Sequence, residues 1–169
     1  MQKLFQHSKE SPFHVSVGAV LYNERGEILV HKFTKEHVPT RVKYLMGDLS
    51  EAYQFMRESV EENESLEGAI ARGLQEEFGV TGTITRYLGS TTVMVPSPHG
   101  DWEKTTLYCA VRLDMQGERP TDDDESFSDL VWVTPQFLHE KMMIQAVPEH
   151  PAHLNDIKIL KTFIQYYGK

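Results

Sequence analysis

The sequence has a single cysteine and no long apolar run, and each absence excludes a class of protein. With Cys109 alone, the chain cannot form an internal disulfide. Cys109 stands in an apolar stretch, which favours a small buried hydrophobic residue over a catalytic thiol. No segment approaches the length of a transmembrane helix, and the first residues lack the apolar core of a signal peptide. We therefore expect a cytoplasmic protein without a membrane partner.

Positive charge is also scarce. The 17 lysines and arginines face 25 aspartates and glutamates, which gives a net charge of −8. A protein that binds a nucleic-acid polymer needs a basic surface to displace counterions, so this charge balance argues against that class. Small anionic substrates stay open, because an acidic pocket can hold magnesium and the ion then faces the phosphates. The 169 residues are enough for a single domain, which we expect to span residues 1–169.

The order of apolar patterns predicts a mixed α/β (α+β) fold with helices packed on a sheet. A hairpin is predicted from residues 13–22 and 27–33, with a turn at 23–26. Residues 34–50 are polar and predict a long loop with some local structure, and a turn is predicted at 96–100. Further strands are predicted at 83–88, 91–95, 105–113 and 130–133, an acidic loop at 114–129, and helices at 65–78, 135–144 and 154–167.

The most informative segment is residues 64–80, ESLEGAIARGLQEEFGV. Ser65 is a plausible N-cap, and Gly79 a stop. At 100° per residue, positions 73, 76 and 77 share one helix face beside an apolar stripe. Glu76 and Glu77 repel each other unless a cation or a proton intervenes. Such a pair taken alone is more often a solvated helix surface, so the neighbouring residues decide its interpretation.

The neighbouring residues resemble the signature of the Nudix hydrolases. That signature is a glycine, five residues, a glutamate, seven residues, and then Arg-Glu-U-x-Glu-Glu-x-Gly-U, where U is a bulky aliphatic residue. Here Glu64 takes the place of the first glutamate and Arg72 follows at the required spacing. The later positions that match are Leu74, Glu76, Glu77, Gly79 and Val80. Two positions depart from the signature: Glu58 stands for the leading glycine, and Gly73 stands for the glutamate after the arginine.

The flanks of the segment extend the resemblance over roughly residues 15–138. A hairpin precedes the box, Tyr53 and Phe55 stand where an aromatic approach to the loop is usual, and Trp132 stands where such proteins often have a tryptophan. The resemblance implies a Nudix-like α/β/α sandwich with a mixed β-sheet. In it, a loop–helix–loop spans about residues 58–80.

The resemblance also implies an activity. Nudix hydrolases cleave the pyrophosphate bond of a nucleoside diphosphate linked to another moiety, using Mg²⁺ or Mn²⁺. By matched position, Glu76 and Glu77 are expected to bind the metal, and Glu64 and Arg72 to hold the loop against the helix. A further carboxylate often comes from a loop before the tryptophan strand. In the run Asp122-Asp123-Asp124-Glu125 we choose Glu125, although a solvated acidic loop is the plainer interpretation.

The two departures have physical consequences. Gly73 removes one carboxylate of the box and puts a flexible residue inside a helix, at a cost of about 1 kcal/mol relative to alanine. Glu58 replaces a glycine that lets the loop bend close to the ion. Magnesium needs only one or two carboxylates besides water and substrate oxygens. We therefore hypothesise that Glu58 or Glu61 is a metal ligand that replaces the carboxylate missing at position 73.

Two interpretations remain open at the sequence level. One is an active hydrolase, slowed by its incomplete box; the other is a catalytically impaired Nudix-fold nucleotide-binding or regulatory domain. A prenyl-diphosphate isomerase is a distant third, because Cys109 does not match the cysteine of that branch. The partner is expected to be a small nucleoside diphosphate derivative, and a homodimer is open because the family often dimerises.

Candidate substrate contacts lie before the box. Arg41, Lys43 and Arg57 could bind phosphates, although a solvated loop is the plainer interpretation. Tyr44 and Tyr53 could stack on a base, because they fall in the segment that leads to the cleft. His150 and His153 have a metal-like spacing, but the prolines around them favour a surface turn.

Overall fold

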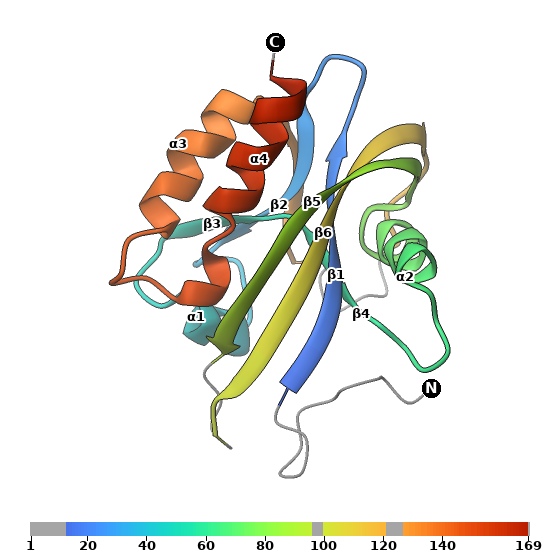
Figure 1. Cartoon of the computed structure of the whole chain (residues 1–169). Helices are drawn as coiled ribbons and strands as arrows, with labels where there is room; N and C mark the ends of the chain where they lie inside the picture. Colours follow the sequence, from blue (N-terminus) through green and yellow to red (C-terminus); the bar gives the residue numbers. More distant parts are fainter. Residues whose placement is uncertain (1–12, 96–99, 121–126, 169) are drawn as a thin grey trace.

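A seven-stranded mixed sheet forms the centre of the computed structural model, which describes residues 13–95, 100–120 and 127–168. Its central strand is β1 (Phe13–Tyr22), which pairs in parallel with β6 (Trp102–Gln116) (Figure 1). β6 in turn pairs antiparallel with β5 (Val80–Val95). The predicted hairpin is confirmed, because β1 pairs antiparallel with β2 (Ile28–Thr34).

The other edge of β1 is divided between two strands. Its residues from Ser16 to Ala19 pair with β4 (Met56–Ser59), whereas Leu21 and Tyr22 pair with β2. β2 continues the sheet through β3 (Glu51–Gln54) and β7 (Asp129–Val133). The sheet therefore divides along this edge of β1, and residues of β2, β3 and β4 face a common space beside it.

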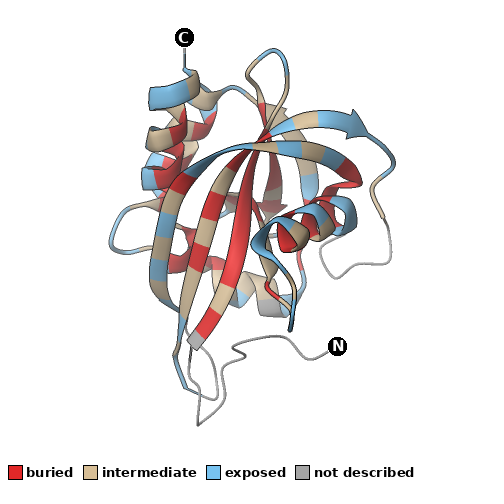
Figure 2. Cartoon of the chain, turned by 45° about the vertical axis from the view of Figure 1, so that its right-hand side comes forward, coloured by how far each residue is buried: buried red, intermediate tan, exposed pale blue. Residues whose placement is uncertain are grey.

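Helices cover both faces of the sheet, which confirms the predicted α/β/α sandwich. On one face, α2 (Leu66–Gly73) and the π-helical turn η1 (Leu74–Phe78) bury Ile70, Leu74 and Phe78 against β1 and β4. On the other, α3 (Pro135–Gln145) and α4 (Ile157–Tyr167) bury Leu138, Met142, Leu160 and Phe163. Figure 2 shows these buried faces turned inward from both sides. None of the helices in the described ranges is long and apolar enough to cross a membrane.

Several predicted element boundaries are wrong. Residues 34–50 contain the helix α1 (Thr40–Met46), because Val38, Met46 and Leu49 are buried beside Phe33 and Leu154. The strands predicted at 83–88 and 91–95 are one strand, β5, whose register shifts at three bulges. β3 and β4 were not predicted, and α4 begins at Ile157, after the short 3₁₀ turn η2 (Ala152–Leu154).

Two predicted loops fall partly outside the described residues. The turn predicted at 96–100 lies there except for Gly100, and β6 extends to Gln116 into the segment predicted as an acidic loop.

Candidate active site

The carboxylate-rich helix begins and ends where the sequence predicts. The Ser65 hydroxyl accepts a hydrogen bond from the Gly68 N–H at 3.0 Å, which caps the first turn of α2. The helix ends at Gly79, whose φ of 68° is left-handed and suits glycine. Between them, the last turn widens into the π-helical η1. Such turns occur often at functional sites, and here the widened turn carries both Glu76 and Glu77.

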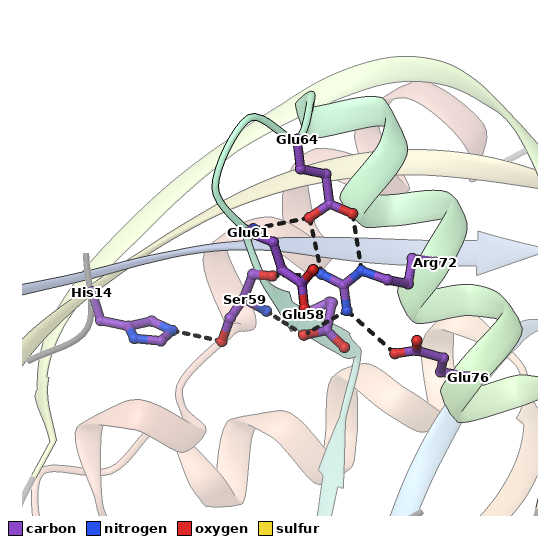
Figure 3. Close-up of polar contacts among 7 residues, drawn as sticks. All are labelled: His14, Glu58, Ser59, Glu61, Glu64, Arg72 and Glu76. Carbon is purple, nitrogen blue, oxygen red and sulfur yellow. Dashed lines mark hydrogen bonds and ion pairs between the residues drawn. The ribbon is translucent and has the colours of Figure 1, made fainter. Parts of the chain in front are cut away.

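Arg72 gathers three carboxylates, and we call Arg72, Glu58, Glu64 and Glu76 the Arg72 cluster (Figure 3). Its Nε and Nη2 donate to the two oxygens of Glu64 at 2.9 and 3.0 Å. Nη2 also donates to the Ser59 carbonyl at 2.8 Å, so the arginine ties the loop to β4. The predicted Glu64–Arg72 pair is therefore present in the structure. It lowers the pKa of Glu64, an effect that burial partly opposes.

Two further carboxylates meet at one nitrogen of the cluster. Nη1 of Arg72 lies 3.2 Å from Oε1 of Glu58 and 3.2 Å from Oε2 of Glu76. The two oxygens are therefore separated by no more than twice that distance. Three carboxylates around one guanidinium leave an excess of negative charge at this point, which is a favourable location for a cation.

The two departures from the signature are neighbours in space. A Cβ added at Gly73 would lie 2.8 Å from the Cβ of Glu58 and 2.7 Å from the Sδ of Met56. Real Cβ atoms essentially never approach so closely. Glu58 on β4 therefore fills the space into which a side chain at position 73 would project. One carboxylate has been lost from α2, and another approaches the same place from the adjacent strand.

Glu77 lies apart from the Arg72 cluster, in the interior. Its side chain is 4% exposed, whereas that of Glu76 is 50% exposed. Oε2 of Glu77 is 2.7 Å from Nε2 of His31, and Nδ1 of His31 is 2.7 Å from the Ser128 hydroxyl. Arg119 donates from Nε to the Glu77 carbonyl at 3.0 Å, which fixes the backbone of η1. Glu76 and Glu77, adjacent in the sequence, thus differ in their surroundings: the first is exposed and the second is buried.

Glu77 and His31 line a cavity of about 400 Å³, within the range of about 300–1,000 Å³ usual for small-molecule sites. β2, β3, β4, β6, α1 and η2 all contribute residues to its wall. Its aromatic and apolar lining includes Phe33, Phe127, Trp102, Met46 and Leu154, and its polar lining includes His31, Gln54, Arg57, Glu77, Lys104 and His153.

Arg57, which the sequence offers as a phosphate contact, lines this cavity, but its guanidinium is already bound by groups of the protein. It forms a buried ion pair with Asp156, donates from Nε to the Tyr108 hydroxyl at 2.8 Å, and donates from Nη1 to the His153 carbonyl at 2.8 Å. The guanidinium is thus occupied by its own protein. The negative charge of Asp156 favours the protonated form and raises the pKa of Arg57, although burial acts in the opposite direction.

Tyr53, Tyr44 and Lys43, also predicted as substrate contacts, are not among the residues that line the cavity. Tyr53 is buried on the opposite side of β3, where it packs edge-on against Phe137 of α3, so its position does not suit stacking on a base. Tyr44 is exposed on α1, and Lys43 borders a separate hollow together with Lys35 and Asp48. Arg41 lies in α1. Glu125 and its acidic neighbours from Asp122 to Asp124 lie outside the described residues.

The sequence did not single out His31 or Lys104, and it misjudged His153. A histidine within the apolar run ILVHKF of β2 is a weak signal of a buried polar role, whereas Lys104 gave none. His153 was expected on a surface turn, but it is 8% exposed and lines the cavity. The prolines do make a turn, and its inner side packs against β3 and β5.

The residues present suit a divalent metal by chemistry. Carboxylate oxygens are the ligands that Mg²⁺ prefers, and one or two are enough when substrate and water complete the shell. Within the described ranges, no three acidic, histidine or cysteine side chains are already arranged around one point. Glu58 and Glu76 nevertheless converge on Nη1 of Arg72, which places one oxygen of each within 3.2 Å of a common point.

The mixed sheet between helices, with a carboxylate-rich loop and helix beside a ligand-sized cavity, defines a class: α+β proteins of the Nudix fold. A family model described as NUDIX domain matches residues 12–154, and the chain belongs to that family. Membership implies a pyrophosphate hydrolase of nucleoside diphosphate derivatives. A search of curated proteins gives no match.

Solved structures share the fold at low sequence identity. A Nudix hydrolase from Nitrosomonas europaea is 12% identical with a TM-score of 0.60, over 91% of this chain and 90% of its own. The E. coli ORF135 protein is 20% identical with a TM-score of 0.56, over 95% and 94% of the two chains. The MutT protein from Methanosarcina mazei Go1 is 21% identical with a TM-score of 0.51, over 96% and 100%.

Proposed function

We propose that this protein is a cytoplasmic, Mg²⁺- or Mn²⁺-dependent hydrolase that cleaves the pyrophosphate bond of a nucleoside diphosphate linked to another moiety. The observation that carries the proposal is the exchange between Gly73 and Glu58. Because Glu58 fills the space beside Gly73 and meets Glu76 at Nη1 of Arg72, the box keeps its acidic side chains despite its two departures.

Glu58 and Glu76 are the proposed metal ligands of the Arg72 cluster. Arg72 now neutralises part of their charge, and a divalent ion would compete with Nη1 for the same oxygens. Glu64 binds Nε and Nη2 on the other side of the guanidinium. The contacts of Nη1 with Glu58 and Glu76 can therefore break while the Arg72 side chain stays in position. Glu61, whose N–H donates to Glu64 at 2.9 Å, is the further loop carboxylate that could join them.

Glu77, which the resemblance makes a metal ligand, stays a proposed ligand, and it would reach the ion from a buried position in the cavity wall. When bound, the ion would neutralise pyrophosphate charge and lower the pKa of a coordinated water. His31 holds the Glu77 carboxylate in place, and the cavity beyond it shields the reacting groups from bulk water. Glu125 stays a proposed catalytic carboxylate, as base or metal ligand, on the strength of the resemblance alone.

The test is hydrolysis of a panel of nucleoside diphosphate derivatives with Mg²⁺ or Mn²⁺, measured as release of mononucleotide or phosphate. We expect Glu77→Gln and Glu76→Gln to lower kcat/KM at least about 100-fold, as the loss of a charge-stabilising group commonly does. Glu24→Gln, which removes the same charge from the exposed turn between β1 and β2, is the matched control and should keep full activity.

The same panel separates the hydrolase from the alternative of a binding or regulatory domain. Mn²⁺ should raise the melting temperature of the wild-type protein, because a ligand that binds only the folded state stabilises it. Glu58→Gln should weaken that effect and Glu24→Gln should not. Nucleotide binding with no turnover by the wild-type protein on any substrate would reject the hydrolase in favour of the binding domain.

A further inference from the structure

Gln54 has an available polar side chain in the wall of the cavity. It is the last residue of β3, it is partly exposed, and it lines the cavity together with Ala52. Tyr53, which lies between them, points the other way and packs against Phe137 of α3, so the alternation of the strand turns Gln54 toward the cavity. None of the hydrogen bonds among the described residues involves its amide.

A second glutamine shows the contrast with a structural role. Gln145 of α3 is 2% exposed, and its Oε1 accepts a hydrogen bond from the Tyr53 N–H at 2.7 Å. Its Nε2 donates to the carbonyls of Tyr53 and Leu154 at 3.0 and 3.1 Å. Gln145 therefore fixes the backbone of the residue next to Gln54. Gln54 thus projects from a strand that is held in place, while its own amide remains available to a ligand.

The position of Gln54 relative to the box indicates which part of a substrate it meets. Gln54 lies directly opposite His31 in the pairing of β2 with β3, which brings their Cβ atoms to about 5 Å from each other. Nε2 of His31 is 2.7 Å from Oε2 of Glu77. A single side chain, that of His31, therefore separates Gln54 from a proposed metal ligand.

The aromatic part of the wall begins at the next pair along the same two strands. There Phe33 lies opposite Ala52. The Phe33 ring stacks on that of His31 with 5.6 Å between centroids, and it lies 6.2 Å from the Phe127 ring. From the box inward, the wall thus has a carboxylate, then the polar pair of His31 and Gln54, and then an aromatic surface. A nucleotide has the matching order of phosphate, ribose and base.

The two hydroxyls of a ribose suit the amide of Gln54 in either of its orientations. Each hydroxyl both donates and accepts, whereas the amide has one donor group and one acceptor group side by side. One hydroxyl can donate to Oε1 while Nε2 donates to the other hydroxyl. Because the two hydroxyls can exchange these roles, the match does not depend on which way the amide is turned. The base itself is better accommodated by the aromatic surface beyond.

We propose that Gln54 is a specificity-determining residue that hydrogen-bonds the 2′- and 3′-hydroxyls of the substrate's ribose. The protein then selects derivatives of ribonucleoside diphosphates over their 2′-deoxy counterparts. This inference rests on the proposed function, because it requires the pyrophosphate of the same substrate to lie at the box.

The test measures binding of nucleoside 5′-monophosphates by calorimetry in the absence of metal. The probes are AMP, GMP, CMP and UMP, each compared with its 2′-deoxy form. For the base that the wild type binds most tightly, we expect the ribonucleotide to bind about tenfold more tightly than the deoxynucleotide, as one additional hydrogen bond implies.

Gln54→Leu should weaken the ribonucleotide to the level of the deoxynucleotide and leave the deoxynucleotide unchanged. Gln54→Glu should keep the preference for ribose, because a carboxylate accepts from both hydroxyls, although its charge weakens every nucleotide. Gln165→Leu, which makes the same change at an exposed position of α4, is the matched control and should behave as the wild type.

Equal binding of both sugars by the wild type would overturn the proposal. An equal loss for both sugars in Gln54→Leu would also overturn it, because it would show a structural role, and so would a changed base preference with the sugar preference intact. The Mn²⁺-induced rise in melting temperature should be the same in Gln54→Leu as in the wild type. Nucleotide binding without a sugar preference rejects only the role of Gln54, whereas a wild type that prefers ribonucleotides but hydrolyses no substrate rejects only the hydrolase.

Discussion

At the scale of single residues, burial decides which charged groups are available to a substrate. Arg57 and Arg72 both stand beside carboxylates, and the sequence alone does not separate them. Arg57 is enclosed with Asp156 and Tyr108 in the interior, whereas Arg72 faces the loop with an excess of carboxylates around it. We therefore expect Arg57 to stabilise the fold. The excess negative charge of the Arg72 cluster, by contrast, can attract a cation.

The role of Arg57 can be tested by its effect on stability. Arg57→Met leaves Asp156 buried without its partner, so we expect a loss of about 3–5 kcal/mol in the free energy of unfolding, measured with urea. The control is Arg25→Met, because Arg25 pairs with Glu27 but is 82% exposed, and its loss should cost less than about 1 kcal/mol. An Arg57→Met protein as stable as the control, but with a raised KM, would instead support the phosphate contact suggested by the sequence.

At the scale of elements, prediction succeeds where the signal is local. The β1–β2 hairpin and the helix from Ser65 to Gly79 were predicted, because alternation, an N-cap and a left-handed glycine act within a few residues. α1 was missed because Val38 and Met46 are buried against Leu154, which is more than 100 positions away in the sequence. A local pattern cannot show such a contact. β3 and β4 are four residues each, too short for a period to be recognised.

For a substitution at Gly73 of helix α2, helix propensity and packing predict opposite effects on the free energy of unfolding. Inside a helix, Gly→Ala ordinarily stabilises by about 1 kcal/mol. At position 73 the new Cβ would collide with Glu58 and Met56 of β4, and overpacking costs about 1–3 kcal/mol. We therefore expect Gly73→Ala to lower the free energy of unfolding, and Glu58→Gly to relieve that loss when the two are combined.

Urea unfolding of the two single variants and the double variant gives the coupling between positions 58 and 73 directly. Additive effects would mean that the side chains do not compete for space. For catalysis, Gly73→Glu combined with Glu58→Gly restores the family pattern and should be more active than Gly73→Glu alone, in which both carboxylates need the same space.

At the scale of the whole molecule, the site consists of a part that the sequence predicts and a part that it does not. The box lies within residues 58–80, so its spacing is visible before folding. The cavity brings together His31, Lys104 and His153 from distant parts of the chain. Nothing in the neighbours of His153 along the sequence shows that Arg57, nearly 100 positions away, anchors its carbonyl. The residues that line the cavity are for that reason harder to predict from the sequence than those of the box.

The buried neutral His153 should also make the whole protein sensitive to acid. Its pKa is about 4 in the folded protein and about 6.5 in the unfolded chain, so the unfolded state binds more protons between these values. The free energy of unfolding should therefore fall as the pH falls from about 6.5 to 4, by about 3 kcal/mol in total from this group. His153→Leu removes that contribution, so the variant should gain stability relative to the wild type as the pH is lowered through this window.

Urea unfolding of both proteins at several pH values between 7.5 and 4.5 measures the difference. The pKa values of Glu51 and Glu64 are lowered by their Lys141 and Arg72 partners, so the stability from these glutamates is lost mainly below their ordinary value of 4.5. That loss is common to both proteins and cancels in the comparison. Parallel curves for wild type and variant would show that the ring of His153 is not held neutral.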